Sequence, residues 1–325
     1  MPQTKLEARK ALGTTGLQVS PLCLGGNVFG WTADEATSFA VLDAFVDNGG
    51  NFIDTADVYS SWVPGNRGGE SETLIGKWMK SRGARERVVI ATKVGSQTEL
   101  GKGLGREHIQ RSVEASLRRL QVDVIDLYYA HYEDLDTPLE ETMAAFDALV
   151  RAGKVRALGT SNHSPQRLTE SLEVSRRNNL ARYAVLQPHY NLVERKNFES
   201  SLRGICEREG LVVAPYFALA SGFLTGKYRK DQPPPKSARA EGVLKQYGNA
   251  RGWAVIDALD AVTRRHPGAN FAQVALAWLA AQPTIVAPIA SATSASQTQE
   301  LLGAFTLQLT EEDLRALDVA SSREA

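Results

Sequence analysis

The sequence predicts an α/β protein built as a closed (β/α)8 TIM barrel. Short apolar runs of strand length alternate with amphipathic segments of helix length along most of the 325 residues. This alternation is typical of parallel strands joined by right-handed helical crossovers. Eight such runs match the strand number of a barrel. The glycine-rich segment 25–30 lacks the GxGxxG spacing of an open dinucleotide-binding sheet. We therefore expect a single barrel domain over residues 1–325.

A small hairpin is the first predicted element, around a glycine-containing turn within residues 9–20, and it would cap the barrel. The predicted barrel strands follow at 22–24, 51–54, 88–92, 125–130, 155–159, 184–187, 211–215 and 285–289. The clearest predicted helices lie at 34–48, 69–80, 106–120 and 138–151.

Local signals mark several helix ends. A capping residue stands before a proline in Thr137-Pro138 and in Ser164-Pro165, which places each proline at the first helical position. Gly49-Gly50 and Gly153 supply the glycines that commonly end helices. One more capped helix is expected to begin after Thr310.

The connection between the seventh and eighth strands is unusually long. It contains the proline-rich stretch 231–236 and a helix-like stretch at 241–265, so we expect an inserted helix there. Loops that leave strand carboxyl ends lie on the catalytic face of a barrel. The insertion is therefore a candidate lid or clamp, and the alternative is a solvent-exposed insertion without a role in binding.

The composition narrows the function classes. Lysine plus arginine and aspartate plus glutamate each number 37, and a chain without net charge or a basic run gives no indication of nucleic-acid or membrane binding. Cys23 and Cys206 are the two cysteines of the sequence, and neither belongs to a Cys/His cluster. We therefore expect two reduced structural thiols and no metal site. Without a predicted signal peptide or membrane span, we expect a soluble cytoplasmic protein.

Polar residues stand at the ends of three successive predicted strands. Asp54 ends the second strand and Tyr59 follows it, while Lys93 and His131 end the third and fourth. Because strand carboxyl ends converge in a barrel, these four side chains are expected to meet. Taken singly, each has an ordinary structural interpretation. Asp54 could cap a helix, Tyr59 could pack at the rim, Lys93 could form a surface ion pair, and His131 could be a buried structural histidine.

Together the four groups suit proton delivery to a carbonyl. A tyrosine has a reference pKa near 10, and a neighbouring lysine ammonium is expected to lower the pKa of Tyr59 into a useful range. Asp54 would pair with Lys93 and hold it charged. Neutral His131 can donate a hydrogen bond that orients a substrate oxygen.

These motifs resemble the aldo-keto reductase family, in particular its bacterial-type branch similar to potassium-channel β subunits. The resemblance covers nearly the whole chain, through residues 51–59, 91–93, 129–131, 159–162, 186–191, 221–227 and 288–293 with Gln297. It implies that Asp54, Tyr59, Lys93 and His131 form the catalytic tetrad.

The resemblance also implies a nicotinamide coenzyme, usually NADPH, across the barrel mouth. By position, Ser161, Asn162 and Gln187 would hydrogen-bond its carboxamide, and Tyr216 would stack on its nicotinamide ring. A clamp over the pyrophosphate would comprise Leu219, Ser221, Gly222, Leu224 and Lys227.

This chain departs from the family pattern at four positions. Phe217 and Ala218 replace a common Ser-Pro, Thr293 replaces a frequent arginine, and Leu301 replaces a frequent asparagine. Without that arginine and its fork-shaped guanidinium, a 2′-phosphate could still contact Ser291, Ser294 and Gln297. We therefore expect NADPH to be preferred, with NADH as a weaker alternative.

The implied activity is reversible, NADPH-dependent reduction of aldehydes or ketones, a small-molecule reaction. Trp31, Trp62 and Tyr132 follow the first, second and fourth strands and are candidate walls of an apolar substrate pocket, or else rim packing. Apart from Arg67, these loops hold few basic residues, which argues against acidic substrates. We expect aromatic or medium-sized aldehydes as substrates.

Two other classes of function remain open. One is a cofactor-binding regulatory or redox-sensing subunit with little turnover, although only a short segment precedes the hairpin here. The other is a barrel lyase that uses Lys93 as a Schiff-base nucleophile. The oligomeric state, the physiological substrate and the preferred direction are not encoded in recognisable form.

Overall fold

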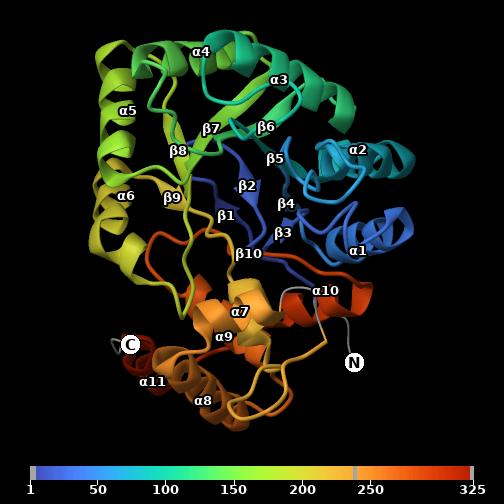
Figure 1. Ribbon diagram of the computed structural model, residues 1–325, viewed down its shortest axis with the longest axis vertical. Helices are drawn as coiled ribbons and strands as arrows, with labels where there is room; N and C mark the ends of the chain where they lie inside the picture. Colours follow the sequence, from blue (N-terminus) through green and yellow to red (C-terminus); the bar gives the residue numbers. More distant parts are fainter. Residues whose placement is uncertain (1–4, 237–239, 323–325) are drawn as a thin grey trace.

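The computed structural model describes residues 5–236 and 240–322, and its centre is a sheet of eight parallel strands (Figure 1). The strand order β10-β3-β4-β5-β6-β7-β8-β9 follows the chain except that the last strand joins the first. The strands are β3 (Cys23–Gly25), β4 (Phe52–Asp54), β5 (Val89–Val94), β6 (Ile125–Ala130), β7 (Val155–Ser161), β8 (Tyr183–Gln187), β9 (Val212–Val213) and β10 (Ile289–Ala290).

The sheet closes on itself just before β10. Val213 forms a parallel bridge with Ile285, and the N–H of Val286 donates to the carbonyl of Val213 at 2.9 Å. The N–H of Ile289 reaches the carbonyl of Pro215 at 2.9 Å. This confirms the predicted (β/α)8 barrel, because the two edges of the sheet form hydrogen bonds with each other.

Helices surround the strands, with α1 to α6 around the upper part of Figure 1 and α7 to α11 in the lower part. Within the described ranges, none of the helices has the length and apolar character needed to cross a membrane. The helices of the barrel layer are α1 (Glu35–Asp47), α2 (Glu70–Arg82), α3 (Arg106–Leu120), α4 (Leu139–Arg151), α5 (Pro165–Arg177), α6 (Arg203–Glu209), α9 (Phe271–Ala280) and α10 (Ala295–Leu302). Short helical segments complete the connections at η1 (Arg85–Arg87), η2 (Phe198–Leu202), η3 (Ala220–Thr225) and η4 (Gly303–Phe305); η2 is a π-helix and η3 is kinked.

Most predicted helix ends are confirmed, and one is wrong by a residue. Ser164 caps α5 by accepting from the N–H of Arg167, with proline next in the chain. Gly153, with φ of 71°, follows the end of α4 in the left-handed region that glycine tolerates. Pro138 itself occupies the cap of α4, with extended ψ of 136°, so the helix begins only at Leu139.

The insertion between the seventh and eighth barrel strands forms two helices, α7 (Ala240–Tyr247) and α8 (Ala250–Arg265), where the sequence predicted one. Asn249 separates them because its side chain accepts from the N–H of Gly252 and so starts a new helix. The α7 helix packs on η3, and the terminal helix α11 (Glu311–Ser322) packs on α8. The predicted helix after Thr310 is confirmed, since the Thr310 hydroxyl accepts from the N–H of Asp313.

The predicted N-terminal hairpin is present as β1 (Lys10–Ala11) and β2 (Gln18–Val19), paired antiparallel. Leu12 and Val19 are buried against apolar side chains that point into the barrel from strands all around it. The hairpin therefore seals one end of the barrel interior.

Alternation along the strands selects the residues that face the interior. Phe52, Ala91 and Leu127 belong to the apolar cluster inside the barrel, whereas Ile53 and Ile90 pack outward under the helices. Because strand side chains alternate, every second residue beyond the inner cluster also faces inward. At the carboxyl ends this parity reaches Asp54, Lys93, His131, Ser161, Gln187, Tyr216 and Ser291.

Candidate active site

Three of the predicted tetrad residues form one buried cluster at the carboxyl ends of β4 and β5. The Lys93 ammonium donates to Asp54 Oδ2 at 2.7 Å, to the Thr55 carbonyl at 2.7 Å and to the Tyr59 hydroxyl at 2.8 Å. The Tyr59 hydroxyl also lies 3.3 Å from Asp54 Oδ2. Gln187 Nε2 donates to the second oxygen, Asp54 Oδ1, at 2.8 Å. Asp54 thus balances the charge of Lys93, and all three N–H groups of the ammonium donate to acceptors of the same chain.

The structure corrects the predicted pKa of Tyr59. Burial of the phenol, followed by the negative charge of Asp54, raises the pKa of Tyr59 well above its usual value. The predicted lowering by Lys93 is therefore wrong in direction, because these two causes outweigh the nearby ammonium. The hydroxyl is held in its protonated form, which suits it to give a proton rather than to take one.

His131 lies beside Tyr59, with their ring centroids 6.1 Å apart in an edge arrangement. Burial and the positive charge of Lys93 hold the pKa of His131 well below its usual value, so the ring is neutral. Its Nδ1 lies 3.0 Å from the hydroxyl of Ser96, a residue that sequence reasoning did not identify. If Ser96 holds Nδ1 as the acceptor, Nε2 carries the proton and is available as a donor.

A second buried polar cluster supports Lys93 from behind. Glu72 of α2 accepts from the Thr92 hydroxyl and from Arg119 Nε, each at 2.6 Å, which ties β5 to two helices next to the lysine. Asp57 lies in the same region, and its N–H donates to the Lys93 carbonyl at 3.3 Å. Neither carboxyl oxygen of Asp57 has a hydrogen-bond partner among the described residues. Burial and the charge of Glu72 raise the pKa of Asp57 to about 8, so this carboxyl is neutral at pH 7.

The residues expected at the nicotinamide are connected to one another and to the tetrad. The Tyr216 hydroxyl donates to Asn162 Oδ1 at 2.8 Å, and Asn162 Nδ2 donates to the His131 carbonyl at 2.9 Å. The Ser161 hydroxyl donates to the Gln187 carbonyl at 2.8 Å. Asn162 adopts φ of 51°, a conformation that asparagine tolerates better than most residues. These side chains are therefore ordered at the rim, and their amides can serve a carboxamide group.

The expected pyrophosphate clamp is a segment of unusual backbone. Phe217, Ala220 and Ser221 all have positive φ, at 52°, 49° and 54°, and Gly222 has φ of 94°. A Cβ added at Gly222 would lie 2.9 Å from Nζ of Lys227. The missing side chain therefore leaves a cradle beside a lysine, which fits a phosphate group. Leu219 stands at the start of this segment and Leu224 is buried under it.

The residues expected at the adenosine end lie after β10 and already have local partners. Ser294 caps α10 by accepting from the N–H of Gln297, whose Oε1 in turn accepts from the N–H of Thr293 at 2.8 Å. The Ser291 hydroxyl donates to Asn27 Oδ1 at 2.6 Å, and Asn27 was not among the predicted residues. A bound 2′-phosphate would compete with these contacts for the same polar atoms.

The three candidate substrate residues form an aromatic rim next to Tyr59 and His131. Trp62 lies edge-on to Trp31 at 5.7 Å and to Tyr59 at 6.2 Å, measured between ring centroids. Tyr132 stacks on His131 at 4.9 Å. Trp62 and Tyr132 remain 48% and 51% exposed, so two large ring surfaces beside Tyr59 and His131 face solvent.

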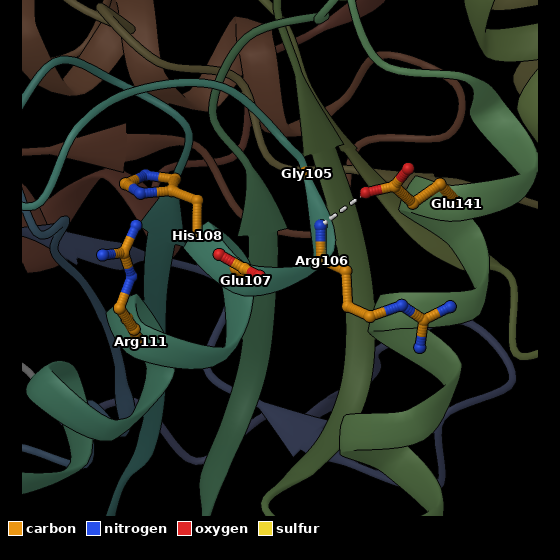
Figure 2. Close-up of a pocket in the computed structure, with 6 residues that line it drawn as sticks. All are labelled: Gly105, Arg106, Glu107, His108, Arg111 and Glu141. Atoms are coloured by element: carbon orange, nitrogen blue, oxygen red, sulfur yellow. Dashed lines mark hydrogen bonds between the residues drawn. The ribbon is translucent and has the colours of Figure 1, made fainter.

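A separate hollow of about 650 Å³ lies at the beginning of α3 and does not involve the tetrad (Figure 2). Glu141 of α4 points toward it and accepts from the N–H of Arg106 at 3.0 Å. A carboxylate thus already occupies the position that an anion would take at this helix start. His108 contacts the Leu100 carbonyl and Ser112, so its ring supports the adjoining loop.

The barrel, the inward tetrad and the glycine cradle together define a class, that of barrel oxidoreductases acting on carbonyl compounds. Over residues 21–322 the chain matches the aldo/keto reductase family, and it belongs to that family.

Several curated relatives are similar along nearly their whole length. A probable voltage-gated potassium channel subunit beta from Oryza sativa subsp. japonica is 37% identical over 306 residues, covering 91% of this chain and 90% of the relative. The uncharacterized oxidoreductase YrpG of Bacillus subtilis is 35% identical over 315 residues, covering 94% of both chains. A norsolorinic acid reductase of Aspergillus flavus is 32% identical over 336 residues, covering 98% of this chain and 82% of the relative.

Proposed function

We propose that this protein is an NADPH-dependent reductase of aldehydes or ketones. The observation that carries the proposal is the Tyr59 hydroxyl, which is kept protonated and lies 2.8 Å from the Lys93 ammonium beside neutral His131. A protonated donor next to a fixed positive charge is what reduction of a carbonyl requires, because negative charge develops on the carbonyl oxygen.

Each member of the tetrad has a separate task in this reaction. NADPH, when bound, supplies the hydride to the carbonyl carbon. Tyr59 gives its proton to the carbonyl oxygen, while an N–H of His131 orients that oxygen. Lys93 stabilises the phenolate that Tyr59 becomes, and Asp54 holds Lys93 in place. In the oxidative direction the same phenolate would accept the proton.

The coenzyme preference rests on the departures at the adenosine end. Thr293 stands where a fork-shaped arginine is frequent, and Ser291, Ser294 and Gln297 offer neutral hydroxyl and amide groups only. Neutral donors favour a 2′-phosphate less than a guanidinium does. We therefore propose that NADPH remains the preferred coenzyme, as the family resemblance implies, and that these departures make NADH a weaker alternative rather than an excluded one.

The substrate class follows from the aromatic rim. Trp62 contacts Tyr59 and Trp31, and Tyr132 stacks on His131, so aromatic rings adjoin the proton donor and its histidine; such surfaces favour flat apolar substrates. Arg67, the one basic candidate in these loops, pairs with Glu99 at 3.5 Å, which lowers its use as an anion receptor. Aromatic aldehydes and ketones are the proposed substrates.

The partner we propose is thus a small molecule rather than a nucleic acid or a membrane, and the proposed place of action is the cytoplasm. The balance of 37 basic and 37 acidic residues and the two buried, unpaired cysteines support this.

A carbonyl panel tests the proposal directly. Aromatic aldehydes, aliphatic aldehydes and acidic keto compounds are incubated with the protein and NADPH or NADH, and loss of reduced-coenzyme absorbance is recorded. We expect turnover of the aromatic aldehydes with NADPH, slower turnover with NADH and little with the acidic compounds. Tight coenzyme binding without turnover of any compound would contradict the proposal.

That contrary outcome describes the second candidate function, a coenzyme-binding regulatory subunit. The similarity to a probable voltage-gated potassium channel subunit beta favours it. A Schiff-base lyase is disfavoured by the structure, because Lys93 donates its three hydrogen bonds within a buried ion pair and offers no free amine lone pair.

A further inference from the structure

His189 forms a ring stack with Tyr216 at the carboxyl ends of β8 and β9. The ring centroids are 5.2 Å apart and the planes differ by 17°. The backbones pair at the same place, with a parallel bridge between the two residues and a 3.0 Å hydrogen bond from the Tyr216 N–H to the Pro188 carbonyl. The imidazole therefore covers one face of the phenol ring, and the ring of Phe217 contacts the phenol edge-on at 5.1 Å between centroids.

The His189 ring is itself held from the side. The Tyr247 hydroxyl lies 3.2 Å from its Nε2, and Asn191 Nδ2 lies 3.4 Å from the same atom. Asn191 Nδ2 also donates to the Phe217 carbonyl at 2.9 Å, which fixes the orientation of the amide. Two donors thus converge on Nε2, so this nitrogen is the acceptor and Nδ1 carries the proton.

Tyr247 brings the inserted helix α7 into this arrangement. It is buried, and its ring lies 5.7 Å from that of Phe223 in η3. The same side chain therefore contacts the clamp segment through its ring and His189 through its hydroxyl. The insertion is connected in this way to the residues at the nicotinamide end of the site.

The phenol of Tyr216 is then restrained on two sides. Its hydroxyl donates to Asn162 Oδ1 at 2.8 Å, and Asn162 in turn contacts the backbone of His131. We propose that His189 is a positioning residue, which holds the Tyr216 ring flat for stacking on the nicotinamide, and that Tyr247 couples the α7 insertion to this platform. The inference rests on the proposed function, since it takes Tyr216 as the surface on which the coenzyme ring lies.

The chemistry of histidine suits this place. A flat ring stacked on another contributes about 0.5–1.5 kcal/mol beyond burial, which corresponds to roughly twofold to tenfold in affinity if it is lost. Burial lowers the pKa of His189, so the ring is neutral at pH 7. A neutral ring places no positive charge behind the surface that would carry the cationic nicotinamide of NADP⁺.

Three variants separate the ring from its hydrogen bond. His189→Ala removes both, His189→Phe keeps a flat ring without the nitrogen acceptor, and Tyr247→Phe removes only the hydroxyl. For each variant, dissociation constants are measured by calorimetry for NADP⁺ and for adenosine 2′,5′-bisphosphate, which lacks the nicotinamide, together with kcat for an aromatic aldehyde.

We expect His189→Ala to weaken NADP⁺ binding by up to about tenfold and to lower kcat, with binding of the bisphosphate unchanged. His189→Phe should recover most of the loss, and Tyr247→Phe should weaken NADP⁺ by about threefold, the scale of one hydrogen bond. Equal weakening of both ligands, or NADP⁺ binding by His189→Ala as in the unaltered protein, would overturn the inference. Failure of the unaltered protein to bind NADP⁺ would instead refute the proposed function, and the inference with it.

Discussion

The proposed catalytic end and the proposed coenzyme end of the barrel mouth are built in different ways. At the catalytic end, Asp54, Tyr59 and Lys93 satisfy one another through short contacts on the ends of β4 and β5. At the coenzyme end, the clamp is a loop whose residues Phe217 and Ser221 have left-handed backbone conformations. The first region rests on regular strands, and the second on a loop that departs from regular structure.

The difference indicates how the two regions contribute to function. A buried charge network has one low-energy arrangement, because removal of either charge leaves the other without its partner. Left-handed non-glycine residues each cost about 1–3 kcal/mol and persist only where their surroundings hold them. We therefore expect the tetrad to be coupled to folding stability and the clamp to be coupled to ligand affinity.

Replacing one lysine in each region gives the largest contrast. Lys93→Met leaves Asp54 buried without its counter-ion, and we expect it to lower the free energy of unfolding by about 3–5 kcal/mol. Lys227→Met removes a cation beside the glycine cradle, and we expect roughly tenfold weaker NADPH binding with little change in stability. Urea unfolding and coenzyme titration measure the two effects.

A double variant is the control for the buried pair. With both Lys93→Met and Asp54→Leu, neither charge remains, and much of the lost stability should return. Stability that falls as far in Lys227→Met as in Lys93→Met would contradict the distinction between the two regions.

Asp57, behind the tetrad, gives a pH-dependent effect of intermediate size. Its pKa is raised to about 8 by burial and by Glu72, so the folded chain keeps a proton that the unfolded chain releases above pH 4 or so. The free energy of unfolding should therefore fall as pH rises from about 4 to about 8. Asp57→Asn removes this dependence, and its stability relative to the unaltered chain should rise by about 3–4 kcal/mol between pH 5 and pH 8. The same difference in free energy of unfolding between Asp57→Asn and the unaltered chain at pH 5 and at pH 8 would show that Asp57 ionises normally.

The smallest effect is expected at the adenosine end, where an added charge should sharpen coenzyme choice. Thr293→Arg restores the guanidinium that is frequent in the family, and the ratio of NADH to NADPH dissociation constants should rise about tenfold. Thr293→Gln, a neutral side chain of similar reach, is the matched control and should change the ratio little. A strong preference for NADPH in the unaltered protein would contradict the weakened discrimination that the sequence predicts.

Much of the fold and the position of the tetrad follow from the sequence, because both depend on periodicity. The alternation of strands and helices predicts the barrel, and the strand ends predict that Asp54, Lys93 and His131 meet. The parallel register, in which Asp54 pairs with Ala91, leaves Lys93 two residues beyond on the same inward side.

Other features depend on tertiary context and escaped prediction. The rise in the pKa of Tyr59 depends on burial, which the strand pattern does not reveal. Ser96 and His189 contact their partners through loop conformations that have no sequence period. By contrast, the break between α7 and α8 had a local signal that the sequence prediction did not use. Asn249, which follows Gly248, is a typical helix cap.

The proposed mechanism depends most on Tyr59 as the proton donor, and Tyr59→Phe tests this role with two measurements on one variant. The substitution removes only the hydroxyl, so the dissociation constant for NADPH should stay within about twofold while kcat for an aromatic aldehyde falls by at least about a hundredfold. Turnover equal to that of the unaltered protein, with the same coenzyme affinity, would show that another group supplies the proton and would contradict the proposed mechanism.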